Sequence, residues 1–127
     1  MLAVDTNVLV RLLVRDEPRQ LDAAERFVEK GAWVSQLVLA ETLWVLQSVY
    51  GLSEAQIGVA VEGLLRHKDL SLQEPEVVEA ALRQFRMRPS LGFSDCLVLE
   101  NARKAGHLPL GTFDRQLAKL DGAQRLS

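Results

Sequence analysis

The sequence predicts an α/β fold, namely a three-layer α/β/α sandwich with a short, mostly parallel central sheet. Short apolar stretches of strand length alternate with longer segments of helical periodicity along the chain. Strands separated by helices pair in parallel through right-handed crossovers, which leaves helices on both faces of the sheet. The chain has 127 residues, of which 48% are hydrophobic, so a sizeable core fits within one domain. We therefore expect a single domain over residues 1–127.

The first part of the chain begins with a buried strand, "LAV" at 2–4, after which Thr6 and Asn7 can start a helix that continues to Arg15. The next helix, which Pro18 introduces, has apolar residues at helical spacing, and we assign all of them to one face: Leu21, Ala24, Phe27 and Val28. The elements expected after it are a strand at 32–35, helices at 36–50 and 53–66, and a strand at 70–72. The helix at 53–66 carries the capping-box spacing of serine and glutamine at its start, "SEAQ".

The second part continues the alternation. Pro75 introduces a helix that runs to Met87, and "PSLGFSD" predicts a loop. Ser94 is the expected N-cap of a helix over 95–105, which Gly106 ends. The elements expected after it are a strand at 108–112, a short helix at 113–120 and a last strand at 123–126.

Composition narrows the class of protein. The formal net charge is -2, so nucleic-acid binding must depend on local patches of basic side chains. The chain has one cysteine, which excludes a disulfide framework and favours the reducing cytoplasm. No apolar run reaches the length of a membrane span, and no secretory signal pattern opens the chain. We expect a cytoplasmic protein without membrane attachment.

One glutamate stands out because it interrupts an apolar run, "LVLAETLWVL" at 37–46. The predicted helix is apolar on nearly all sides, so the sequence places Glu41 among buried neighbours. A buried carboxylate without a partner costs several kcal/mol, and such groups are usually paired or bound to a metal. We therefore expect Glu41 to point into a cation site. The alternative is an exposed Glu41 on a helix that is less buried than its composition suggests.

Three aspartates follow other predicted strands or loops. Ligands of parallel α/β sheets bind beyond the carboxyl ends of the strands, where these acids would meet Glu41. Each aspartate taken alone is better explained as a helix cap, and only the combination favours a shared site. Together, four carboxylates repel one another unless protons or a divalent cation neutralise them, and oxygen ligands suit Mg²⁺ or Mn²⁺. The predicted catalytic and metal-binding residues are Asp5, Glu41, Asp95 and Asp114.

Four motifs, in this order, resemble the PIN-domain ribonucleases, in particular the VapC-type toxins of toxin–antitoxin pairs: "VDTNVLVRLL", "LVLAETLWVL", "GFSDCLVLENARKAG" and "GTFD". The resemblance spans the whole chain. It implies a compact PIN-like α/β/α domain, a Mg²⁺- or Mn²⁺-dependent endoribonuclease, a homodimer, and inhibition by a small antitoxin protein.

Carried over residue by residue, the family's acidic quartet falls on the same four acids. Its small polar positions near the site fall on Thr6, Asn7, Ser94 and Thr112. Cys96 stands where a small apolar residue is usual, and we interpret it as a packing residue and not as a nucleophile.

Two surfaces are expected beyond the acids. Arg11 and Arg15 are the candidates for RNA binding, although an ordinary solvated helix face explains them as well. The helix at 53–66 carries Ile57, Val61 and Leu64 at helical spacing, and these side chains belong either to a homodimer seam or to the core.

Two other functions are possible alternatives to a ribonuclease. A phosphoacceptor receiver-like signalling domain also has an acidic Mg²⁺ pocket. It needs paired acids after the first strand and a lysine after a late strand, but only Asp5 follows the first strand here and "LPLGTFD" contains no lysine. A catalytically inactive PIN-like domain that only binds RNA or protein would not need all four acids.

Overall fold

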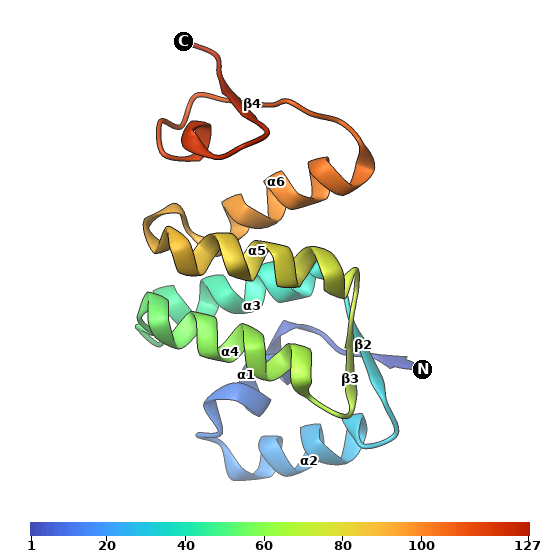
Figure 1. Cartoon of the computed structure of the whole chain (residues 1–127). Helices are drawn as coiled ribbons and strands as arrows, with labels where there is room; N and C mark the ends of the chain where they lie inside the picture. Colours follow the sequence, from blue (N-terminus) through green and yellow to red (C-terminus); the bar gives the residue numbers. More distant parts are fainter. The chain divides into compact units, whose positions relative to one another are not determined.

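Three short parallel strands form the sheet of the first part of the chain (Figure 1). The computed structural model describes residues 1–127 and divides into two units, Met1–Pro75 and Glu76–Ser127. In the first unit the strands are β1 (Leu2–Ala3), β2 (Ala32–Val34) and β3 (Leu70–Leu72), in the order β1-β2-β3. The pairing places Leu2 beside Ala32 and Ala32 beside Leu70. Helical crossovers connect these strands, as parallel pairing requires.

The helices of the first unit are α1 (Thr6–Val14), α2 (Pro18–Val28), α3 (Gln36–Ser48) and α4 (Glu54–Arg66). All of them except α2 begin at a side chain that caps the helix. Asp5 caps α1 by accepting a hydrogen bond from the backbone N–H of Val8 at 3.1 Å. Ser53 forms the predicted capping box with Gln56. These caps fix where each helix leaves its strand or loop, so they also fix the position of Asp5.

The core of the first unit includes residues that we had considered for a dimer seam. Ile57, Val61 and Leu64 are only 1%, 0% and 2% exposed. Their helix α4 packs against α3 and β3. The seam prediction is therefore wrong for these three residues, because the face of α4 on which they lie is covered within the chain itself.

The second unit holds a separate parallel pair of strands, β4 (Leu110–Thr112) and β5 (Ala123–Arg125). Its helices are α5 (Pro75–Met87) and α6 (Phe93–Ala105), with 3₁₀ turns η1 (Pro89–Leu91) and η2 (Leu117–Lys119). The rings of Phe85 and Phe93 meet edge to face, with centroids 5.9 Å apart. This contact joins α5 to the start of α6.

The α/β class and the parallel pairing are confirmed, with corrections at the level of elements. The strands form two sheets, one in each unit, where we had expected one central sheet. Helix α6 starts at Phe93 and its N-cap is Gly92 at φ 80, so Ser94 is not the cap. The helix expected at 113–120 is reduced to η2. A single domain over residues 1–127 stays a prediction.

None of the helices combines the length and the apolar character that crossing a membrane requires.

Candidate functional site

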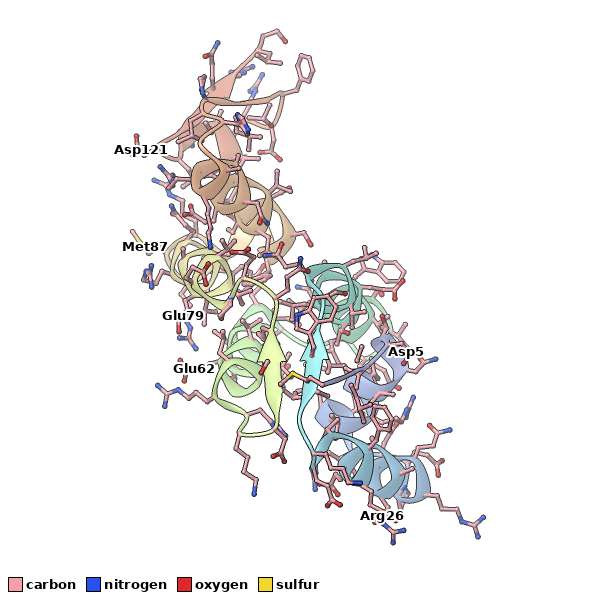
Figure 2. All side chains as sticks on the ribbon, turned by 90° about the vertical axis from the view of Figure 1, so that its right-hand side faces the viewer. Asp5, Arg26, Glu62, Glu79, Met87 and Asp121 are labelled. Atoms are coloured by element: carbon pink, nitrogen blue, oxygen red, sulfur yellow. The ribbon has the colours of Figure 1, made fainter.

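Asp5 lies where the chain passes from β1 into α1 (Figure 2). Its side chain is exposed, and one carboxylate oxygen accepts the hydrogen bond from Val8. Asp5 is therefore held in place by its capping role while the rest of the carboxylate stays open to a ligand. Asp5 is thus a helix cap, as one of the two interpretations of the sequence predicted. Capping uses one carboxylate oxygen, so it does not compete with cation binding by the other.

Glu41 is exposed, which corrects the expectation that its apolar neighbours bury it. Leu37 and Trp44, one turn to either side, are 80% and 64% exposed, so the face of α3 that carries Glu41 is open. The hydroxyl of Thr6 donates a hydrogen bond to the Glu41 carboxylate. Because Thr6 follows Asp5 directly, this bond brings the Glu41 carboxylate to the start of α1. The first unit thus places two of the predicted acids at one location.

The second unit brings together the other two acids. Asp95 lies in the first turn of α6, and Asp114 follows β4. Burial raises the pKa of Asp95 above 3.8, and the negative charge of Asp114 raises that pKa further. Asp114 is held by its own loop, since its Oδ1 accepts hydrogen bonds from the backbone N–H groups of Gln116 (2.8 Å) and Leu117 (3.0 Å).

The small polar residues have different positions. Thr6 binds Glu41, as described above, and Thr112 accepts a hydrogen bond from the backbone N–H of Asp114 at 3.0 Å. Asn7 and Ser94 are exposed in the first turns of α1 and α6. Thr6 and Thr112 therefore each support one of the predicted acids.

The two candidate RNA-binding arginines are engaged in ion pairs. Arg11 lies 2.6 Å from Asp16 and also donates a hydrogen bond to the hydroxyl of Tyr50 at 3.1 Å. Arg15, which is exposed, lies 3.4 Å from Glu25. Contact with RNA phosphate would have to compete with these partners, more so for Arg11 than for Arg15.

Cys96 packs in the interior, as interpreted from the sequence. It is 0% exposed, and its pKa rises to about 11 because burial and the charges of Asp95 and Glu100 disfavour the thiolate. A thiol in this state is a poor nucleophile at neutral pH.

A cleft of about 590 Å³ opens beside Asp5, between α1 and α2. It is lined by Asp5, Asn7, Val8, Arg11, Gln20, Ala23, Ala24 and Phe27. Gln20 and Phe27 were not predicted as site residues. We had assigned Phe27 to the core face of its helix, but its side chain is 43% exposed. Helical periodicity alone does not distinguish the edge of an apolar face from its buried centre.

Neither unit gathers three or more acidic, histidine or cysteine side chains in an arrangement that could hold a metal ion. Each unit instead supplies two carboxylates. All four carry hard oxygen donors, the type that Mg²⁺ and Mn²⁺ prefer. Burial and, second, the charge of Asp114 raise the pKa of Asp95, and a bound cation would offset the repulsion between these two carboxylates. The donor chemistry therefore fits a divalent cation.

Comparison with known proteins identifies the family. The model of the PIN domain matches residues 2–123 of the chain. Searches of the curated proteins and of the solved structures found no match. The family match spans all four acids and leaves no support for the receiver-like alternative.

Proposed function

This chain belongs to the PIN domain family, and from that premise we propose that it is a Mg²⁺- or Mn²⁺-dependent endoribonuclease that acts in the cytoplasm. PIN domains are generally nucleases and generally bind these cations. The observation that carries the proposal is the pairing of acids: Thr6 ties Glu41 to the position next to Asp5, and Asp114 acts on the pKa of Asp95.

We propose that both pairs serve the same cation. The order of the motifs in the sequence and the family match across both units support this assignment. Asp5, Glu41 and Asp95 would hold the ion directly, and Asp114 would complete its shell or help to hold a second ion. When bound, the cation lowers the pKa of water and stabilises negative charge on phosphoryl oxygens.

The chain's own residues orient the acids. Thr6 donates to one oxygen of Glu41 and so restricts the rotation of that carboxylate. The two backbone N–H groups at Asp114 Oδ1 leave the other oxygen of this carboxylate for the cation. Such hydrogen-bonded supports commonly set the geometry of carboxylate ligands. Thr6 and Thr112 are therefore positioning residues in this proposal.

Cleavage of a labelled panel of single-stranded RNAs, with and without Mn²⁺, tests the activity. We expect cleavage that requires the cation and that Asp5→Asn reduces at least about 100-fold, because loss of a ligand disturbs both nucleophile formation and charge stabilisation. Asp22→Asn is a matched control, since Asp22 is an exposed aspartate of α2 that pairs with Arg26. Equal cleavage by wild type and Asp5→Asn would contradict the proposed site, and absence of cleavage by the wild type would favour a PIN-like domain that only binds its partner.

We further propose that the enzyme is the toxin of a toxin–antitoxin pair and forms a homodimer. The resemblance of its motifs to VapC-type toxins supports the toxin role. Exposed apolar side chains on α3 and α4, including Trp44 (64%) and Val59 (68%), are available for association. Growth arrest on expression, relieved by the product of a neighbouring short reading frame, tests the toxin role. Sedimentation at micromolar concentration tests the dimer.

A further inference from the structure

We infer that the cleft between α1 and α2 is a nucleobase subsite, which holds one base of a single-stranded RNA next to the phosphate to be cut. This inference rests on the proposed ribonuclease function and adds to it a binding site for the substrate. The cleft begins at Asp5 and extends to Phe27, and its volume of about 590 Å³ falls within the range of small-molecule sites.

The walls of the cleft suit an aromatic ligand. Phe27 contributes an aromatic ring that is 43% exposed, and Val8 and Ala23 add further apolar surface. Phe27 is not the anchor of its helix, because Ala24 and Val28 are the buried residues of α2. An exposed ring beside small apolar side chains is the kind of surface on which an unstacked base packs.

The polar groups of the cleft favour a base over an anionic group. Asn7 and Gln20 present amides, which can both donate and accept hydrogen bonds at a base edge. The charge of Arg11 is already neutralised by Asp16 at 2.6 Å. Apart from the cation proposed at Asp5, a phosphate or an acidic peptide would therefore find no free positive charge among the residues that line the cleft. A neutral, planar, hydrogen-bonding ring matches the cleft better.

An abasic scan of a cleaved oligoribonucleotide tests this inference. Identical single-stranded substrates carry one abasic residue, moved along the chain position by position, and KM and kcat are measured for each. For the wild type we expect KM to rise about tenfold when the abasic residue occupies one position beside the cut. An abasic residue at any other position should leave KM nearly unchanged. A flat scan would overturn the subsite.

Variants assign the effect to the cleft. Phe27→Ala should raise KM on the intact substrate about tenfold and remove the sensitivity to that one abasic position. Phe27→Trp should keep both the low KM and the sensitivity, because tryptophan also stacks. Met87→Ala is the matched control, since Met87 is an exposed apolar residue of α5 (77%) outside the cleft. Phe27→Ala kinetics equal to wild type would contradict the inference.

Failure of the subsite and failure of the ribonuclease proposal give different results. If the wild type cleaves RNA in an Asp5-dependent manner but the abasic scan is flat, only the subsite is wrong, and the cleft is left to a protein partner. If the wild type cleaves no RNA, both proposals are overturned. Gln20→Ala provides a second variant, and we expect it to raise KM for some base identities more than for others.

Discussion

Glu41 shows how the composition of a helix can mislead about the surroundings of a single residue. Its apolar neighbours predicted burial, yet the structure exposes Glu41 together with Leu37 and Trp44. What locates Glu41 is the hydrogen bond from Thr6, a contact between residues 35 positions apart. Sequence periodicity carries no information about such a contact. The motif resemblance did point to Glu41, because it depends on the order of residue types along the chain.

The exposure of Glu41 changes what its substitution should do. Glu41→Gln is expected to abolish cation-dependent RNA cleavage while changing the free energy of unfolding by no more than about 0.5 kcal/mol, as at other exposed sites. Cleavage assays and thermal unfolding of the same cation-free variant measure both effects. Near-normal cleavage by Glu41→Gln would remove this residue from the proposed site.

Asp95 gives a prediction about pH. Its pKa is higher in the folded chain than the ordinary value of 3.8, because of burial and the charge of Asp114. The folded state therefore binds this proton more tightly than the unfolded state. Its contribution to stability is present below pH 3.8 and is lost as pH rises through the folded-state pKa. Asp95→Asn should stabilise the cation-free protein at pH 7, by less than about 1 kcal/mol, and have no such effect near pH 3.

Urea unfolding at the two pH values checks this result. Asp114→Asn should act in the same direction at pH 7, because it removes the second cause of the raised pKa. A loss of stability in Asp95→Asn at pH 7 would mean that the carboxylate makes a favourable contact that outweighs the repulsion.

At the scale of elements, the positions of the long helices and of the five strands were predictable, whereas the division of the strands between two sheets was not. Helices are recognised in a sequence by their caps and by a periodicity that extends over many residues. The capping box of Ser53 and Gln56, for example, marks the start of α4. The strands have only two or three residues each, so they were predicted as short apolar stretches between helices and not from a periodic pattern. Their division between two sheets depends on long-range pairing, which local sequence does not encode.

Helix α4 provides a test of which face is buried. Ile57→Asp is expected to lower the free energy of unfolding by at least about 3 kcal/mol, because it places a charge and a cavity where the side chain is 1% exposed. Val59→Asp, on the same helix at a residue that is 68% exposed, should have a small effect. Chemical denaturation measures both variants. A stable Ile57→Asp protein of smaller assembly size would restore the seam interpretation that the structure contradicts.

At the scale of the whole molecule, the predictable part of the function is the family. The motifs that carry the acids lie in both units, and the family match covers residues 2–123. The cleft beside Asp5 was not predictable, because it arises where α1 and α2 pack and its aromatic residue was indistinguishable from a core residue in the sequence. Family membership was thus predictable from the order of the motifs, whereas features such as this cleft depend on the packing of particular helices.

The last prediction concerns the cation and the chain as a whole. If Asp5, Glu41, Asp95 and Asp114 hold one cation, Mn²⁺ should stabilise the folded chain by about 2.7 kcal/mol at a concentration near one hundred times Kd. Asp5→Asn and Asp95→Asn should each remove most of this stabilisation. Asparagine also caps helices well, so Asp5→Asn keeps the cap of α1 and isolates the loss of charge.

The double variant Asp5→Asn/Asp95→Asn tests whether the pair in the first unit and the pair in the second unit bind the same cation. A shared cation predicts strongly non-additive effects, because the first substitution already removes the binding energy that the second would disturb. Two independent cations, one at each pair, predict that each single variant loses part of the stabilisation and that the losses add. Asp22→Asn serves as the control, since this exposed aspartate lies in an ion pair with Arg26 and not with the four acids. A Tm that does not respond to millimolar Mn²⁺ in the wild type would contradict both arrangements and leave the four carboxylates without a cation role.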